Sequence, residues 1–180
     1  HGGMMRKALL IFGVIGWYAP SVQAEEWYCV VWGWNNARGP VRPWTSHTCA
    51  AWVHVSGGKI IGKVEINWGP GGHRLIADSV EEARSRNLAI RRVVLGADAK
   101  FLDMAKKQRD MLRGYRFLDR PHRPLAVNCL HAVSDTAGWL DTGPLCGVAG
   151  SQRIADFFVL RGLARPSDQY WLANAIEEGR

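Results

Sequence analysis

Three consecutive segments rich in aromatic and β-branched residues place the strongest constraint on how this chain can fold. They cover residues 27–34, 47–55 and 59–68, and the pair Gly57-Gly58 lies between the second and the third. This composition is typical of β-strands, and a glycine pair between two such segments indicates a tight hairpin turn. The segment 35–45 contains glycine and prolines, so it predicts a loop. We therefore expect an antiparallel sheet in the first part of the fold.

Helical signals dominate the rest of the chain, apart from a short strand expected over 90–95. Polar residues that can cap a helix are followed by apolar residues at helical spacing. The expected helices and their caps are 79–86 (Asp78 or Ser79), 99–113 (Asp98), 129–137 (Asn128), 152–160 (Ser151) and 168–178 (Ser167). The inner face of the second would hold Phe101, Leu102, Ala105 and Leu112. The fold class that follows is α+β, with a small antiparallel sheet packed against helices.

The first 24 residues have the composition of a tag remnant followed by a signal peptide. His1-Gly2-Gly3 is typical of an expression-vector remnant, and a short basic segment precedes an apolar run over 8–19. That run is too short to span a bilayer comfortably, although an uncleaved anchor is the alternative reading. Val22-Gln23-Ala24 fits the small-x-small cleavage rule, so we expect cleavage after Ala24. Residues 25–180 would then form a single secreted or periplasmic domain.

The chain is basic, with a net charge of +7 that falls to +5 for residues 25–180. In an exported protein this excess favours anionic envelope polymers or lipid headgroups over nucleic acid, and simple solubility explains it equally well. The basic residues are spread over 84–124 without a nucleic-acid-binding signature. We therefore expect no nucleic-acid partner, membrane contact only through the signal peptide, and a monomer.

Asn128-Cys129-Leu130-His131 carries the chemistry, together with an isolated Ser46-His47-Thr48 upstream. Asn128 is placed to cap a helix whose first residue is Cys129. The backbone N–H groups of a helix N-terminus and a nearby imidazolium both favour a thiolate, the reactive form of cysteine. The same N–H groups can stabilise an oxyanion formed when the thiolate attacks a carbonyl. The predicted nucleophile is Cys129, with an oxyanion site at the Asn128–Cys129 turn.

His47 is the predicted general base, because it begins a strand whose edge can face that helix. His131 is less suited to this role, since side chains two residues apart on a helix diverge. A third polar group should orient the His47 ring. Asn67 on the next strand is our candidate, and Glu65, which shares its sheet face by alternation, is the alternative.

Four cysteines lie in the expected mature domain and allow three disulfide pairings, between which the sequence does not choose. Cys29 and Cys49 fall on neighbouring strands and could be bridged. A bridge between Cys129 and Cys146 would instead cap the predicted nucleophile, either as an oxidised resting state or because the thiol is structural. No ligand spacing typical of a metal site is present, so we expect neither metal nor cofactor.

The tryptophans provide candidate substrate contacts, since aromatic side chains bind sugars and apolar ligand faces. Trp32 and Trp34 should share one face of the first strand, opposite to Val31. Trp44, in the loop just before His47, is expected to line a substrate groove. Trp68 and His131 are further candidates for substrate contact. The alternative is a small core filled with large side chains; the six clustered tryptophans are Trp27, Trp32, Trp34, Trp44, Trp52 and Trp68.

The motif Asn-Cys-x-His at 128–131 resembles that of the circularly permuted papain-like hydrolases. This group includes lecithin retinol acyltransferases, PPPDE-type peptidases and permuted relatives of the NlpC cell-wall peptidases. Ser-His-Thr-x-Ala at 46–50 and Ile-Asn-Trp-Gly-Pro at 66–70 are similar to exported bacterial members, and the resemblance covers roughly 27–70 and 115–160. It implies a permuted papain-like arrangement in which the histidine precedes the cysteine in the chain.

The expected function is that of an exported cysteine hydrolase. The resemblance implies an amidase or peptidase acting on cell-wall peptide or a related amide bond. The alternatives are a lipid acyl hydrolase or acyltransferase, a non-catalytic envelope binding or inhibitor module, and a secreted effector with the same chemistry. The residues after the motif, 132–135, and the absence of a second strand histidine depart from the acyltransferase pattern.

Overall fold

The computed structural model describes residues 24–36, 46–117, 126–138 and 146–180. Residues 1–23 of the predicted signal peptide and Trp44 lie outside the described residues. A sheet of order β3-β2-β1-β6-β9, antiparallel at every step, forms the centre of the fold. Its strands are β1 (Glu25–Asn35), β2 (Ser46–Ser56), β3 (Lys59–Ile66), β6 (Ile90–Ala97) and β9 (Ala164–Pro166). The short pairs are β4 (Trp68–Gly69) with β5 (Gly72–His73), and β7 (Arg116–Phe117) with β8 (Ala126–Val127).

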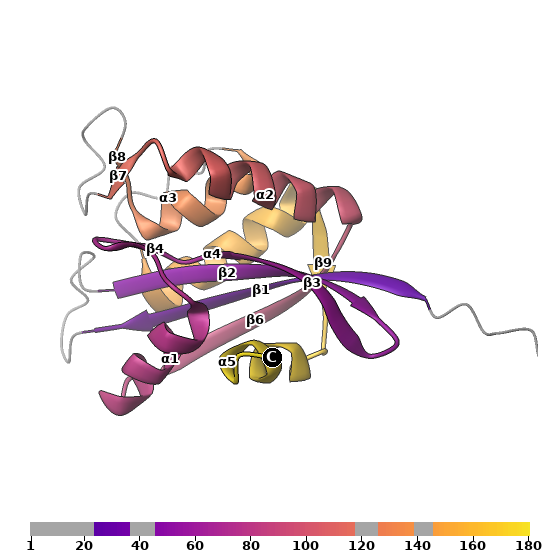
Figure 1. Ribbon diagram of the computed structural model, residues 1–180, viewed down its shortest axis with the longest axis horizontal. Coiled ribbons are helices and arrows are strands. Elements are labelled where there is room, and N and C mark those ends of the chain that lie inside the picture. Colours follow the sequence, from indigo (N-terminus) through magenta and orange to yellow (C-terminus); the bar gives the residue numbers. More distant parts are fainter. Residues whose placement is uncertain (1–23, 37–45, 118–125, 139–145) are drawn as a thin grey trace, which may run out of the picture.

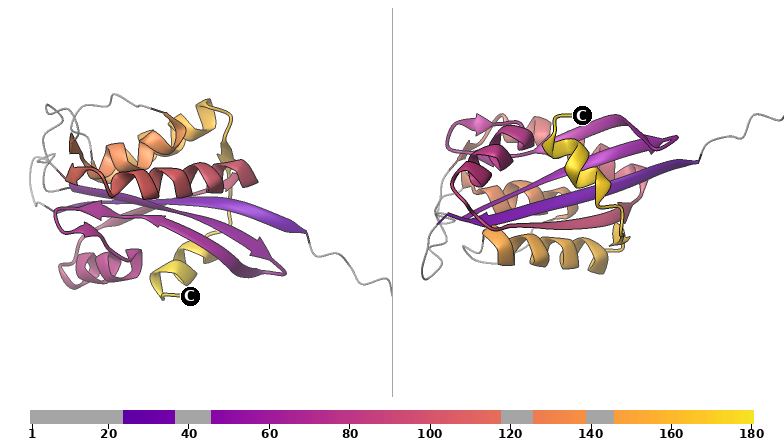
Figure 2. Two further views of the ribbon diagram at one scale, coloured as in Figure 1. Left: turned by 45° about the horizontal axis from the view of Figure 1, so that its top comes forward. Right: turned by 90° about the horizontal axis from the view of Figure 1, so that it is seen from below.

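Helices cover both faces of this sheet, as Figures 1 and 2 show. On one face lie α2 (Ala99–Leu112), α3 (Cys129–Ser134) and α4 (Gly147–Leu160), and on the other lie α1 (Ile76–Ser85) and α5 (Trp171–Glu177). A single 3-10 turn (Asp135–Ala137) extends α3. The architecture confirms the predicted α+β class with a small antiparallel sheet between helices.

Strict alternation along β1 divides its side chains between two apolar cores. Val31 belongs to the core beneath α2, α3 and α4, whereas Trp32 and Trp34 belong to the core beneath α1 and α5, as predicted. The four predicted inner-face residues of α2 are likewise buried. The same alternation places Cys29 and Cys49 on opposite faces of the sheet. A disulfide between these two cysteines is therefore excluded by the geometry.

Helices α1 and α4 begin earlier than predicted, because side chains from the strands accept hydrogen bonds from the backbone N–H groups of their first turns. Helix α1 begins at Ile76, before Asp78 and Ser79, because the Glu65 carboxylate from β3 accepts a hydrogen bond of 2.8 Å from the Ile76 N–H. Helix α4 begins at Gly147, and Ser151 lies inside it, where its hydroxyl donates to the Val148 carbonyl.

The last helix, in contrast, begins later than predicted. Helix α5 starts at Trp171, and the Ser167 hydroxyl accepts a hydrogen bond of 3.3 Å from the Gln169 N–H in the turn before it. Ser167 thus shapes a local turn that precedes the helix without capping it.

The start of α4 is pressed directly against the ends of β1 and β2. A Cβ added to Gly33 would lie 2.2 Å from the Gly147 carbonyl oxygen, and Gly147 itself has a φ of 86°. The Gly147 N–H donates to the Thr48 hydroxyl at 2.8 Å. Only glycine permits both the close approach and the positive φ. Because Gly147 binds Thr48, the preceding residue Cys146 lies close to the beginning of β2.

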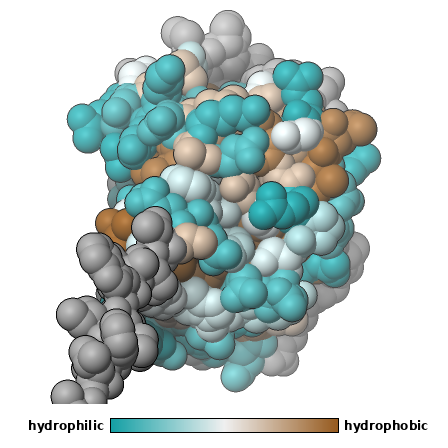
Figure 3. Space-filling view, turned by 90° about the vertical axis from the view of Figure 1, so that its right-hand side faces the viewer, coloured by the Kyte–Doolittle hydropathy of each residue, from teal (hydrophilic) through white to brown (hydrophobic). Residues whose placement is uncertain are grey.

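Figure 3 views the opposite end of the molecule, where much of the described surface is hydrophilic. Among the described residues, no helix has the length and apolar character needed to cross a membrane.

Candidate active site

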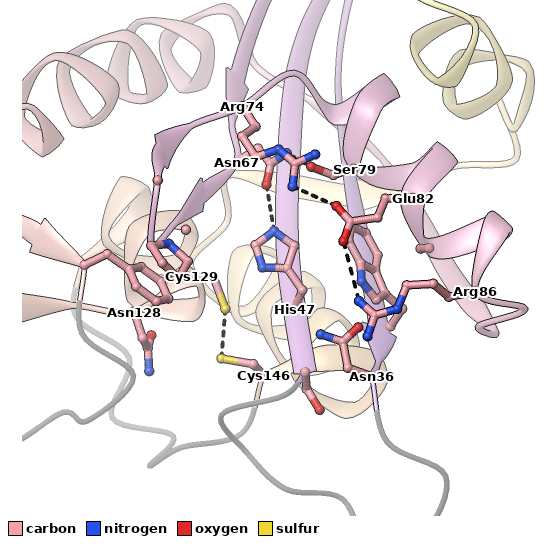
Figure 4. A pocket seen from close by; sticks show the side chains of 17 residues that line it. Asn36, His47, Asn67, Arg74, Ser79, Glu82, Arg86, Asn128, Cys129 and Cys146 are labelled. Carbon is pink, nitrogen blue, oxygen red and sulfur yellow. Dashed lines mark hydrogen bonds and ion pairs between the residues drawn. The ribbon is translucent and has the colours of Figure 1, made fainter.

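A pocket of about 430 Å³ opens where β2 begins and β3 ends (Figure 4). Side chains from the sheet, from α1 and from the starts of α3 and α4 surround it. Those from the sheet side include Trp34, Ser46, His47 and Asn67; those from α1 and the loop before it include Arg74, Ser79, Glu82 and Arg86; and those from the remaining elements include Phe117, Asn128, Cys129 and Cys146.

His47 and Asn67 form the shortest polar contact in this pocket. The His47 Nε2 and the Asn67 Oδ1 are 2.6 Å apart. The Asn67 amide nitrogen donates to the Leu75 carbonyl at 3.2 Å and to the Ser79 hydroxyl at 2.7 Å. With both of its donors used, and 1 % exposed, the Asn67 side chain is held in one orientation.

This network fixes the tautomer of His47. A carbonyl oxygen can only accept, so the Leu75 contact requires the nitrogen of the Asn67 amide to face away from the imidazole. The Asn67 oxygen therefore faces His47, and the Nε2 atom must carry the hydrogen. In the neutral ring Nδ1 is then an acceptor, which is the form a general base needs.

Cys129 stands at the first position of α3, as predicted. The Asn128 side chain accepts a hydrogen bond of 2.8 Å from the His131 N–H and caps the helix. The Cys129 sulfur lies 3.0 Å from that of Cys146, and both sulfurs line the pocket as thiols. In Figure 4 the His47 ring lies between Asn67 and the two sulfur atoms.

The ionisation of this group differs from the expected thiolate and imidazolium. The pKa of the Cys129 thiol is raised well above its usual value, first by the hydrogen bond with Cys146 and then by burial, and a backbone hydrogen bond from Thr48 only partly offsets this. Burial also lowers the pKa of His47, against the hydrogen bond to Asn67, which raises it. At neutral pH the site therefore holds a thiol beside a neutral imidazole.

The predicted site residues are thus divided between the pocket and the core. Cys129, His47, Asn67 and Asn128 come together, although Asn67 is more than sixty residues from Cys129 in the chain. Glu65, the alternative to Asn67, instead binds the Ile76 N–H and pairs with Lys63 at 2.9 Å.

Two predicted substrate contacts are not brought to the pocket. Trp68 is buried, and its indole N–H donates to the Val127 carbonyl at 3.2 Å. His131 is 1 % exposed and is absent from the pocket lining. Trp68 belongs to the apolar core on the α2 side of the sheet, where burial of its large ring stabilises the fold, and His131 is buried within α3. Trp44 lies outside the described residues.

The wall formed by α1 was not foreseen from the sequence. Ser79, Glu82, Ala83 and Arg86 line the pocket together, and Arg74 joins them from the loop before the helix. Their spacing of three, four and seven residues from Ser79 is that of one helix face. This pattern was visible in the sequence, but nothing there connected that face with His47.

Among the described residues, no cluster of three or more histidine, cysteine, aspartate or glutamate side chains is arranged to hold a metal ion. Comparison of the chain with protein-family models, with curated proteins and with solved structures found no match.

Proposed function

We propose that this protein is a cysteine hydrolase that cleaves an acyl bond, with Cys129 as nucleophile, His47 as general base and Asn67 as the residue that orients His47. The observation that carries the proposal is the 2.6 Å contact between His47 Nε2 and Asn67 Oδ1. It supports a ring whose Nδ1 is an acceptor, in a pocket that also contains the Cys129 sulfur. A nucleophile, a base and an orienting amide are the three parts that thiol hydrolysis needs.

The reaction proceeds in two steps, acylation of Cys129 and hydrolysis of the resulting thioester. The Cys129 thiol transfers its proton to His47 Nδ1 as the sulfur bonds to the acyl carbon. The carbon–nitrogen bond then breaks, and the leaving amine takes the proton from His47. Water next attacks the thioester with His47 again accepting a proton, and the carboxylic acid and the Cys129 thiol are released.

The pKa directions support proton transfer during attack over a preformed ion pair. The pKa of Cys129 is raised and that of His47 is lowered, so the neutral pair is the ground state. A base whose pKa lies below its usual value is unprotonated at neutral pH and is ready to accept the thiol proton. The capped first turn of α3, with Asn128 at its start, offers backbone N–H groups for the resulting oxyanion.

The proposed substrate class is based on the sequence. The expected signal peptide and the resemblance to NlpC-type enzymes favour an amide bond in cell-wall peptide, with a lipid ester or acyl transfer as the next choice. We propose secretion or a periplasmic location, and a monomer, on the same grounds.

Thiol alkylation provides the test. Iodoacetamide should modify Cys129 of the purified protein, and His47→Ala should slow this reaction at neutral pH by about a hundredfold or more, because the base is lost. Cys129→Ala should abolish it. His54→Ala is the matched control: His54 belongs to the same strand but stacks on Trp27, 4.7 Å between ring centroids, and should leave the rate unchanged. Equal rates in the two histidine variants would contradict the proposal.

A non-catalytic module stapled by disulfides is the second candidate, and the 3.0 Å approach of the Cys129 and Cys146 sulfurs favours it. Counting thiols in the protein isolated from its own compartment separates the two. Retention of the Cys129 thiol supports the hydrolase. A complete Cys129–Cys146 disulfide that persists in the functional protein supports the staple.

A further inference from the structure

The wall of the pocket formed by α1 carries an unbalanced positive charge. Arg74 and Arg86 both line the pocket, and Glu82 lies between them. The Glu82 carboxylate accepts from Arg74 Nη1 at 2.8 Å and from Arg86 Nη1 at 3.5 Å. Glu82 is the only acidic residue among the described residues that line the pocket. Two guanidinium groups against one carboxylate leave a net charge of +1 on this wall.

The contacts with Glu82 hold both arginines at the pocket and leave most of their N–H donors available. A guanidinium has five N–H donors in a planar fork, and Glu82 receives a bond from one terminal nitrogen of each. The hydrogen bond from Arg74 and then its charge, together with Arg86, lower the pKa of Glu82, so the bridge stays ionised at neutral pH. Both arginine side chains remain about half exposed, with relative exposures of 49 % and 51 %.

The same wall adjoins the reacting groups. Ser79, one turn before Glu82 on α1, binds the Asn67 amide that orients His47. The charge of Arg74 also acts on His47, where it adds to the effect of burial in lowering the pKa. An anion bound by the two arginines would therefore lie beside the imidazole.

We propose that Arg74 and Arg86 bind a carboxylate of the substrate, and that the hydrolase prefers acyl substrates with an acidic group next to the scissile bond. This inference rests on the proposed function. A planar carboxylate matches the fork of a guanidinium, and such charge-assisted hydrogen bonds are shorter and stronger than neutral ones. Because Glu82 reduces the net charge of the wall to +1, a single substrate carboxylate is enough to neutralise it.

Two alkylating reagents of nearly equal size provide the test, because iodoacetate is an anion and iodoacetamide is neutral. The quantity measured is the alkylation rate of Cys129 with iodoacetate divided by its rate with iodoacetamide. This ratio is then divided by the same ratio for free glutathione. We expect this ratio to fall by about threefold to fivefold in Arg74→Gln and in Arg86→Gln, since both cations are half exposed. It should also fall toward the variants' value at 1 M salt.

Lys59→Gln is the matched control, since it removes one exposed positive charge at the β2–β3 hairpin, away from the pocket. Its ratio should equal that of the unchanged protein. A ratio that is the same in all four proteins would overturn the inference while leaving the proposed hydrolase intact.

If Cys129 reacts with neither reagent, that result contradicts the proposed function. A binding measurement then still tests the anion site. Cys129→Ser protein is titrated with the C-terminal amides of acetyl-Ala-Glu and acetyl-Ala-Gln, of which only the first carries a carboxylate, while the His47 ring signal is followed by NMR. Tighter binding of the glutamate peptide, lost in Arg74→Gln, supports the anion site. Equal binding of the two peptides overturns it.

Discussion

Two polar clusters each include a residue of α1, Arg84 in one and Ser79 in the other, and they use their polar atoms in opposite ways. The Glu177 cluster consists of Trp32, Arg84, Arg92 and Glu177, and the His47 cluster consists of His47, Asn67, Ser79 and Cys129. The Glu177 carboxylate accepts from the Trp32 indole at 2.7 Å, from Arg92 at 2.5 and 2.9 Å, and from Arg84. Its side chain is fully buried.

In the His47 cluster, the hydrogen-bonding groups of the Asn67 side chain all have partners, but those of the His47 ring do not all have one among the described residues. Asn67 uses all of its polar atoms, but the His47 ring keeps one acceptor nitrogen, which the tautomer assigns to Nδ1, in a pocket that also holds two sulfurs. A carboxylate surrounded by donors stabilises the fold, whereas an acceptor beside a thiol can take a proton. Burial alone therefore does not identify a reactive group; the balance of donors and acceptors does.

The largest expected effect is on stability, from loss of the carboxylate at the centre of the Glu177 cluster. Glu177→Ala should lower the free energy of unfolding by about 3 kcal/mol, because it leaves the buried Trp32 N–H and the partly buried Arg92 guanidinium without their acceptor. Denaturant unfolding measures this. Glu178→Ala, which breaks an exposed pair with Arg180, is the control and should cost less than about 0.5 kcal/mol. Equal losses in the two variants would argue that the cluster contributes nothing.

The next effect is kinetic and concerns the orientation of His47. Asn67→Ala should lower the rate of Cys129 alkylation by about a hundredfold, because the ring is no longer held in place. The acid limb of the pH–rate profile should lie below pH 6.5, since burial lowers the pKa of His47. That limb should move lower still in the variant, because the bond to Asn67 raises this pKa. Ser79→Ala, which leaves the Leu75 contact of Asn67 intact, should lose less activity. An unchanged profile in Asn67→Ala would contradict the role given to Asn67.

A smaller effect of opposite sign is expected at Cys146. Cys146→Ala removes the hydrogen bond and the charge interaction that raise the pKa of Cys129, so this pKa should fall. Alkylation of Cys129 at pH 7 should become several-fold faster, which mass spectrometry can follow at each pH. A slower reaction would mean that Cys146 assists ionisation of its neighbour.

The smallest effect compares Glu177 with Asp135, a carboxylate that lacks donors. Burial raises the pKa of Asp135 to about 6, and its Oδ1 has no hydrogen-bond partner among the described residues. Ionisation of Asp135 should therefore cost stability as the pH rises from about 4, its unfolded value, past 6. Asp135→Asn should remove that loss, seen as a smaller fall in Tm between pH 5 and pH 7.5.

Glu177 should give the reverse slope. Burial acts to raise its pKa, but the hydrogen bonds from Arg92 and Trp32, together with the charges of Arg92 and Arg84, outweigh burial and lower it. Its contribution is therefore present above the unfolded pKa and is lost as the pH falls through the lower folded value. The stability difference between the unchanged protein and Glu177→Ala should shrink in acid; a difference that grows in acid would contradict this assignment.

The sequence by itself determined the type of the main local elements and which of their side chains share a face, although the starts of α1, α4 and α5 differed from the prediction. The alternation over 27–34 and 47–55 specified which side chains enter which core, because a pleated strand alternates faces whatever its partners are. Asn128 was correctly read as the cap of the helix that starts at Cys129, since capping depends on neighbours within one turn. Chemistry that depends on adjacent residues can be predicted in this way.

Tertiary structure decided what depends on contacts between distant segments. The choice of Asn67 over Glu65 required the position of α1, which engages both: Glu65 through the Ile76 N–H, and Asn67 through Ser79 and the Leu75 carbonyl. The contact of Cys146 with Cys129 required the close packing of Gly147 against the strand ends. The direction of the Cys129 pKa followed from that contact and from burial, against the local effect of the helix start. Burial and long-range partners arise only when the chain is folded, so the short-range pattern could suggest Cys129 as a candidate nucleophile but could not give the protonation state of its thiol.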